Sequence, residues 1–153
     1  LAQHGIETTM CGDLFAQMRS VLTLQRGQVN ERRLRGEAEL PKMLTSRDVM
    51  EFATIEGARA NGLDSLVGTL TPGKEADVIM LRTDRINVLP INDPIGVVVR
   101  GMDSSNVDSV WIAGKPKKRH GHLVNVDLDR VTRLAYESRD YVVAKSGFVL
   151  PSI

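Results

Sequence analysis

The sequence predicts a mixed α+β fold, because helical and strand-like segments follow one another in a recognisable order. Apolar residues recur at helical spacing in residues 13–27 and 45–62, and again at the C-terminal end. Short runs rich in β-branched residues lie between them, in residues 76–126. The chain has 153 residues, 42% of them apolar and 25% charged, which is enough for one core.

The first predicted helix begins after Asp13, a favourable N-cap whose carboxylate can accept hydrogen bonds from the free amides of the first turn. Its apolar face, spaced by three and four residues, consists of Leu14, Phe15, Met18, Val21 and Leu22. Gly27 predicts the end of this helix. The densely charged residues 28–42 then predict a solvated loop with at most one short helical turn.

The second predicted helix begins at Thr45. Thr45 and Asp48 have the spacing of a capping box, and Leu44 and Val49 have that of a hydrophobic staple. The helix then carries a stripe of small or β-branched residues that favours close packing: Val49, Ala53, Gly57 and Ala60. Asn61-Gly62 predicts its end, since both residues tolerate a left-handed conformation.

The middle of the chain predicts a group of short strands. Thr71 to Lys74 indicates a turn, with Pro72 before Gly73 as a type II turn prefers. The predicted strands are residues 76–81, 97–99, 107–113 and 123–126, with Trp111 on the third. A tight turn at residues 113–116 joins the last two, so we expect a small β-hairpin or meander.

A last helix is predicted after Asp127, a second favourable N-cap. Its apolar side consists of Leu128, Val131, Leu134, Ala135 and Val142. The strands before it are bunched together, and the first helix lacks a convincing preceding strand. Strands without partners leave open edges, so we expect a homo-oligomer that forms through unpaired strands and exposed apolar faces.

Composition excludes several classes of protein. No apolar run approaches the roughly 20 residues of a membrane span, and the first residues have no signal-peptide pattern, so we expect a cytoplasmic protein without membrane contact. The one cysteine, Cys11, excludes an internal disulfide framework and is expected to be a small buried residue. A net charge of +1 gives no indication of nucleic-acid binding.

Four stretches of the chain resemble the amidohydrolase superfamily, in particular its cytosine-deaminase-like and chlorotriazine-hydrolase-like branch. They are Gly12 to Arg19, Leu44 to Ala60, Gly62 to Ile79, and Val107 through Val124. The third is the most specific, with the run Val67-Gly68-Thr69-Leu70-Thr71-Pro72-Gly73-Lys74-Glu75-Ala76-Asp77. Their order and spacing match those of the family over most of residues 6–126.

The resemblance implies a fold and an organisation. The family combines a (β/α)8 barrel with a small β-sandwich built from both chain ends, and a barrel needs roughly 200 residues or more. This chain would therefore hold the C-terminal helices of an incomplete barrel with their connecting loop (1–62), part of the β-sandwich (63–126), and a C-terminal helix and tail (127–153). The partners of its bunched strands would lie in an N-terminal region that this sequence lacks.

The resemblance also implies a chemistry. The parent enzyme would use zinc or iron to hydrolyse a C–N or C–Cl bond of a nitrogen heterocycle. The metal-binding histidines of the family belong to the missing part. Its aspartate ligand would align with Gly5, beside His4, where no carboxylate stands. Either the first residues are foreign to the family or this copy has lost its ligand. We therefore assign no catalytic, cofactor-binding or metal-binding residue, and we expect this chain to be inactive.

Three motifs imitate functional sites. His120-Gly121-His122 has the form of a metal-binding pair but lacks a third ligand nearby, so we expect it to be exposed. Gly68 to Lys74 imitates a phosphate-binding loop, but Glu75 stands where a hydroxyl is needed and Pro72 removes an amide, so we expect a plain turn. Lys115 to Arg119 is basic, but it has none of the interleaved aromatic residues that a nucleic-acid-binding patch would need. We therefore expect an exposed hairpin tip.

Three functional hypotheses remain open from the sequence. The first is a portion of a metal-dependent amidohydrolase. The second is a non-enzymatic, truncated protein that self-associates. The third is a regulatory or binding module that uses the basic hairpin.

Overall fold

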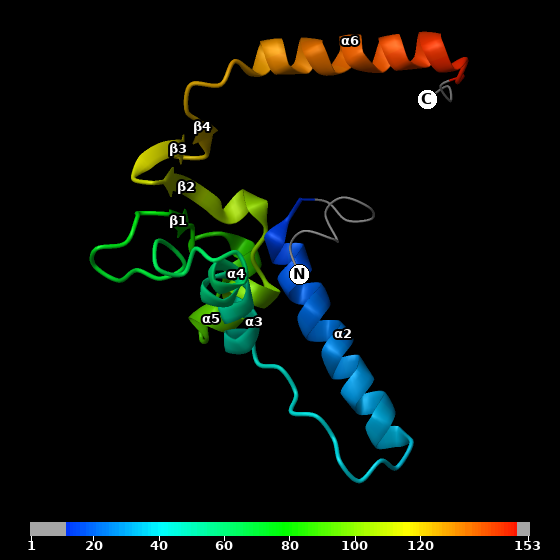
Figure 1. The fold of residues 1–153 in the computed structure, drawn as a ribbon, viewed down its shortest axis with the longest axis vertical. Helices are drawn as coiled ribbons and strands as arrows, with labels where there is room; N and C mark the ends of the chain where they lie inside the picture. The colour runs from blue at the N-terminus through cyan, green and yellow to red at the C-terminus, as the bar shows by residue number, and fades with distance from the viewer. Residues whose placement is uncertain (1–11, 150–153) are drawn as a thin grey trace. The chain divides into compact units, whose positions relative to one another are not determined.

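The computed structural model describes residues 12–149. The chain divides into two compact units, one up to His122 and one from Leu123 onward, which are described separately. The fold is mixed α+β, as the order of elements predicts, with a four-stranded antiparallel sheet and several helices (Figure 1). No helix among the described residues is long and apolar enough to cross a membrane.

Helix α2 spans Leu14–Leu34. Asp13 caps it, since its carboxylate accepts hydrogen bonds from the amides of Phe15 and Ala16, and this prediction is confirmed. The predicted end at Gly27 is wrong, because the helix continues through the first part of the predicted loop. A glycine inside a helix costs only about 1 kcal/mol relative to alanine. Val29, which is 2% exposed, and the helix-forming residues that follow it outweigh that cost.

The second predicted helix is two helices, α3 (Ser46–Ala53) and α4 (Ile55–Ala60). The capping box is confirmed: Thr45 Oγ1 accepts from the Asp48 amide, and the Asp48 carboxylate accepts from the Thr45 amide at 2.7 Å. The single long helix is wrong, because the backbone breaks at Thr54. The end at Asn61-Gly62 is confirmed, and Gly62 has φ +68°.

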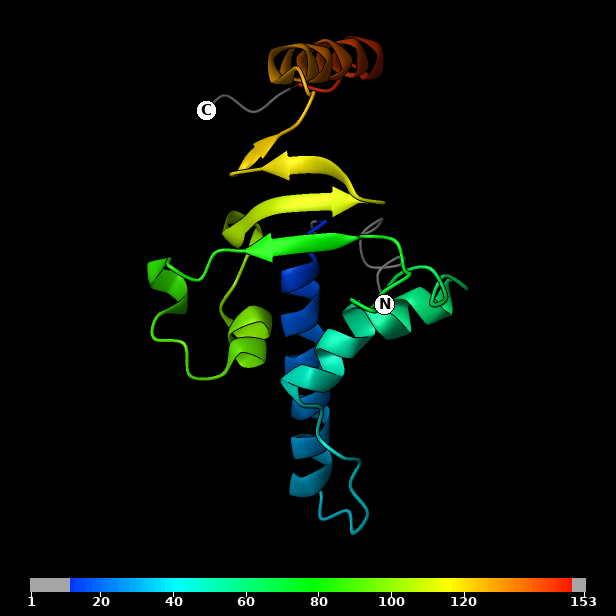
Figure 2. The same ribbon diagram turned by 90° about the vertical axis from the view of Figure 1, so that its left-hand side faces the viewer.

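The sheet has the order β1-β2-β3-β4 and consists of Val78–Leu81, Val107–Ile112, Lys115–Arg119 and His122–Leu123. Figure 2 shows these strands side by side, with the helices of the first unit gathered on the β1 side. Val78 faces Trp111 in the β1–β2 pair, and Ile112 faces Lys115 in the β2–β3 pair. The β2–β3 turn uses Ala113 and Gly114 at positive φ, as the twist of a tight hairpin requires.

The connection from β1 to β2 carries a 3-10 turn (Ile86–Val88), helix α5 (Pro94–Arg100) and a second 3-10 turn (Ser104–Asn106). Here the sequence prediction fails, since Val97, Val98 and Val99 form part of α5 rather than a strand. Asp93 caps α5 by accepting from the Gly96 amide, and Pro94 occupies the first turn, where its missing amide costs nothing. Burial of Val99, which is 0% exposed, then outweighs its β propensity.

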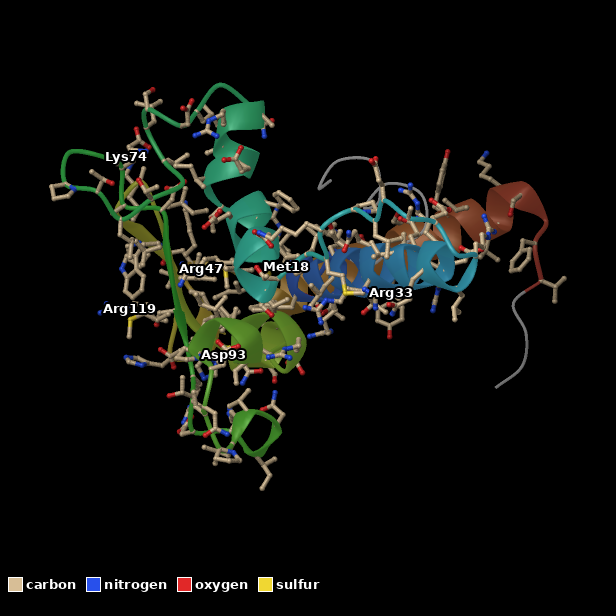
Figure 3. All side chains as sticks on the ribbon, turned by 90° about the horizontal axis from the view of Figure 1, so that it is seen from below. Met18, Arg33, Arg47, Lys74, Asp93 and Arg119 are labelled. Carbon is tan, nitrogen blue, oxygen red and sulfur yellow. The ribbon has the colours of Figure 1, made fainter. Side chains whose placement is uncertain are left out.

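The core lies where α2, α3 and α5 meet, and Figure 3 shows Met18 at that place. Its buried members are Phe15, Met18, Leu22, Val49, Val88, Val99 and Met102. Leu81 of β1 and Val107 of β2 pack against this cluster, which attaches the sheet to the helices. The first unit is therefore built around contacts between segments far apart in the chain.

The second unit contains helix α6 (Leu128–Ser146). The predicted N-cap is confirmed, because the Asp127 carboxylate accepts from the Arg130 amide at 2.9 Å. Gly147 ends the helix in the left-handed conformation, with φ +68°. No residue of α6 is buried by the described part of the chain.

Candidate functional site

The first unit contains an apolar groove of about 760 Å³ between α2, the α3–α4 pair and the first residues of β1. Residues 67–70 form part of its wall. The groove exposes large apolar side chains, with Leu14 at 43%, Phe52 at 38% and Ile79 at 52%. Such clustered apolar surface is typical of an interaction site rather than of an ordinary exterior.

A buried amide lies in the wall of this apolar groove. The side chain of Gln17, on α2, is 7% exposed, and neither its Nε2 nor its Oε1 has a hydrogen-bond partner among the described residues. Leaving such a group unsatisfied costs about 1–3 kcal/mol. Gln17 belongs to no motif and was not predicted from the sequence to be a site residue. Its position between Leu14 and Val21 on the apolar face of α2 is the signal that could have identified it.

The loop that imitates a phosphate-binding motif is a structural turn. A Cβ on Gly68 would come within 2.8 Å of the Ala58 Cβ, so the loop lies directly against α4 and needs glycine there. The Lys74 ammonium, labelled in Figure 3, donates to the carbonyl oxygens of Asp64 and Val67 in the same loop. This lysine therefore braces its own turn, and the expectation of a plain turn is confirmed.

The two C-terminal histidines do not form a metal pair. His120 and Gly121 make the turn between β3 and β4, and both His120 and His122 are exposed, as expected. His120 Nδ1 lies 3.8 Å from Asp108 Oδ2, and its side chain is 86% exposed. A zinc site needs three or four converging ligands.

The described residues do not fit a catalytic metal. Within residues 12–149, no three histidine, cysteine, aspartate or glutamate side chains come together. The expectations about the aspartate ligand and the thiol concern His4, Gly5 and Cys11. These three residues lie outside the part of the chain that the structure describes. The assignment of no site residue stays a prediction.

A smaller polar hollow of about 320 Å³ lies at the start of α3, where Figure 3 labels Arg47 and Asp93. Arg26 Nε donates to the Leu44 carbonyl at 3.0 Å, and Arg100 pairs with Asp93 at 3.3 Å. Two of its arginines are therefore engaged with the chain itself.

The perturbed carboxyl groups belong to turns and caps. Hydrogen bonds from the Thr45 side chain and amide lower the pKa of Asp48. Hydrogen bonds from the Arg82 guanidinium lower the pKa of Asp84 to about 2, and the pKa of Arg82 is raised in return. Both carboxyl groups are ionised at neutral pH and stabilise local structure, so neither is poised as a general acid.

Comparison with known proteins identifies the class. The sequence profile of the amidohydrolase family matches residues 2–117. A 5-methylthioadenosine/S-adenosylhomocysteine deaminase from Teredinibacter turnerae is 27% identical over 148 residues, which cover 95% of this chain and 33% of the relative. The chain belongs to the amidohydrolase family, and it spans about a fifth to a third of the length of the curated relatives it matches.

Solved structures share the fold. An adenosine deaminase from Xanthomonas campestris with bound zinc superposes with a TM-score of 0.72 at 24% identity, over 86% of this chain and 28% of that one. Atrazine chlorohydrolase from Arthrobacter aurescens TC1, complexed with zinc, gives 0.68 at 20% identity, over 80% and 25%.

Proposed function

We propose that this chain is the C-terminal portion of an amidohydrolase that hydrolyses a C–N or C–Cl bond of a nitrogen heterocycle. In this proposal α2, α3 and α4 are outer helices of the family's barrel, and the four-stranded sheet is its share of the β-sandwich. The observation that carries the proposal is the family match over residues 2–117 in a chain that covers a third or less of its relatives. Aminopurine nucleosides are the favoured substrates, because the relatives include deaminases of methylthioadenosine and adenosine.

The role of these residues is to complete a fold rather than to perform the reaction. The apolar groove gives the chain a surface that another part of a barrel would cover, and Gln17 would gain hydrogen-bond partners there. The residues described here do not fit the metal, so no step of the reaction is assigned to them.

A chimera tests this proposal. Residues 13–153 of this chain replace the aligned C-terminal part of the Teredinibacter turnerae deaminase, with the junction just before the position aligned with Asp13. We expect the chimera to retain zinc and to deaminate 5-methylthioadenosine. The relative truncated at the same junction is the matched control and should do neither.

A second measurement keeps the proposal testable if the chimera fails to fold. The truncated relative and this chain are produced together from separate genes, and their association is measured by co-purification. A stable complex supports the proposal. A folded chimera without zinc and turnover contradicts it, as does an insoluble chimera together with no association of the separate chains.

The second candidate function is non-enzymatic self-association, and the exposed helix α6 is the observation that favours it. Sedimentation of the purified 153-residue chain tests this alternative. A monomer at all accessible concentrations would remove it.

A further inference from the structure

Asn61 and Gly62, at the end of α4, form the one pair in the sequence in which glycine follows asparagine. In such a pair the main-chain nitrogen of the glycine can attack the side-chain Cγ of the asparagine, because no Cβ on the second residue hinders the approach. Both residues are exposed, so water and hydroxide reach them. The pair therefore has the chemistry of a deamidation site.

The reaction needs only water and a base. A bond forms between Gly62 N and Asn61 Cγ, the bond from Cγ to Nδ2 breaks, and the side-chain amide leaves as ammonia with the proton that Gly62 N loses. Water then opens the five-membered imide on either side of its nitrogen. One product is aspartate, and the other is isoaspartate, in which the main chain runs through Cβ and Cγ. In both products a carboxylate replaces the amide.

The folded chain holds the two reacting atoms in the wrong geometry. Ring closure needs Gly62 N nearly in the plane of the Asn61 Cβ, Cα and C atoms. Asn61 has ψ 4°. At this angle its Cβ lies about 120° of rotation from that plane, since the substituents of a tetrahedral carbon are spaced by about that much. The main chain at Asn61 therefore has to rotate before the reaction can begin.

Hydrogen bonds to α4 also hold both reacting groups. The attacking nitrogen is engaged, because Gly62 N–H donates to the Arg59 carbonyl at 3.0 Å. The leaving group is engaged as well, because Asn61 Nδ2 donates to the Gly57 carbonyl at 2.7 Å. Both acceptors belong to the last turns of α4, so the reaction has to wait until this end of the helix opens.

The end of α4 is fixed more firmly than a free helix end. Leu63 N–H donates to the Ala58 carbonyl at 2.9 Å, and with Gly62 at φ +68° this bond completes a Schellman motif. Ala58 also lies directly against Gly68, in the wall of the apolar groove. Opening of the turn has to loosen these contacts, so we expect it to be a rare local event.

The product would not restore the turn. A carboxylate at position 61 has no N–H to donate to the Gly57 carbonyl. It also places negative charge at the C-terminal end of a helix, where the helix dipole disfavours it. Asn61 borders the apolar groove, so each modified chain would keep a weakened groove wall.

We propose that Asn61 is a deamidation site of this chain, and that opening of the last turn of α4 controls its reaction. The rate in the folded chain is then the rate of the unfolded pair multiplied by the fraction of chains in which this turn is open. The inference uses residues 55–68 alone, so it does not rest on the enzymatic proposal.

Mass spectrometry of the 153-residue chain tests the site and its control. The chain is incubated in mildly alkaline buffer, once folded and once in guanidinium chloride, and the change from amide to acid is followed at every asparagine. We expect Asn61 to react faster than the other asparagines in denaturant, and about tenfold or more slowly in the folded chain than in denaturant. Equal rates at Asn61 in the two states would overturn the proposal, as would a faster reaction at another asparagine in denaturant.

A matched pair of exposed alanines tests the role of the turn. Ala60→Gly weakens the last turn of α4 and should speed deamidation of the folded chain about fivefold, as the low helix propensity of glycine implies. Ala144→Gly makes the same change in the last turn of α6 and should leave the rate at Asn61 unchanged. In denaturant, both variants and the unchanged chain should react alike.

Two results with these variants would contradict the proposal. One is equal acceleration by both variants. The other is no acceleration by Ala60→Gly in a chain that keeps its Trp111 unfolding transition. If Ala60→Gly fails to fold, the comparison between the folded and denatured states of the unchanged chain decides.

Discussion

The two long helices of this chain begin alike, but only α2 is packed within its own unit. α2 and α6 contain 21 and 19 residues, and an aspartate N-cap precedes each. Each has a stripe of apolar side chains. α2 nevertheless buries Phe15, Met18, Leu22 and Val29, whereas α6 buries nothing among the described residues.

The difference shows that the features that form a helix are distinct from the contacts that pack it against the rest of a fold. Caps and spacing act over a few residues and are present in both helices. Burial depends on segments that are distant in the sequence. Helix α2 contacts α3 and α5, which follow it later in the chain. For α6 the structure gives the caps and the apolar stripe, and no burial within its own unit.

The largest expected effect comes from a core truncation. Met102→Ala removes a side chain that is 2% exposed and should lower the free energy of unfolding by about 2–5 kcal/mol. Val142→Ala, on the exposed face of α6, should change it by less than about 0.5 kcal/mol. Denaturant unfolding followed by the fluorescence of Trp111, the one tryptophan, measures the first unit directly. Equal effects of the two variants would break the comparison.

A buried polar network gives the next effect. Asn106 is 0% exposed, and its Oδ1 accepts from Asn87 Nδ2 at 2.9 Å and from the Asp103 amide at 3.1 Å. Asn106→Ala should lower the free energy of unfolding by about 1–3 kcal/mol, because it leaves these donors without an acceptor. The exposed Asn92→Ala serves as the control in the same fluorescence measurement and should leave the transition unchanged.

The two aspartate caps sharpen the contrast between the helices. Asp13→Ala should lower the free energy of unfolding of the first unit by about 1 kcal/mol, since the cap is coupled to a packed helix. Asp127→Ala should reduce far-ultraviolet circular dichroism through fraying of α6 but leave the Trp111 transition in place. A shift of that transition by Asp127→Ala would mean that α6 is packed on the first unit.

The smallest expected effect is a dependence on acid. The pKa of Asp84 is lowered from 3.8 to about 2 by Arg82, so folding favours its ionised form. The stabilisation is complete above about pH 4 and is lost as the pH falls toward 2, where the folded state also binds the proton. Asp84→Asn should therefore flatten the decline of stability between these values. An unchanged decline in acid titrations followed by Trp111 would contradict the role of this pair.

Much of the local structure could be predicted from the sequence, because its causes are local. The Thr45–Asp48 capping box, the turn at Thr71 to Lys74 and the cap at Asp127 each depend on residues within one turn. Two predictions were wrong because contacts between residues far apart in the sequence determine the local structure there. Val29 carries α2 past Gly27, and burial of Val99 makes a helix of residues that favour a strand.

The candidate site was harder to predict for the same reason. Gln17 is an ordinary polar residue in the sequence, and only packing reveals that its amide is buried. The family could be identified from the sequence, because the order and spacing of its four segments can be recognised without knowing which residues are in contact.

The central proposal is that this chain contributes packing surface to an amidohydrolase, while the metal ligands come from another part of the enzyme. Zinc content and deaminase turnover of the purified 153-residue chain, measured after zinc loading and dialysis against a chelator, test it most directly. The account predicts no retained zinc and no turnover of 5-methylthioadenosine or adenosine. One tightly held zinc per chain together with turnover would contradict it.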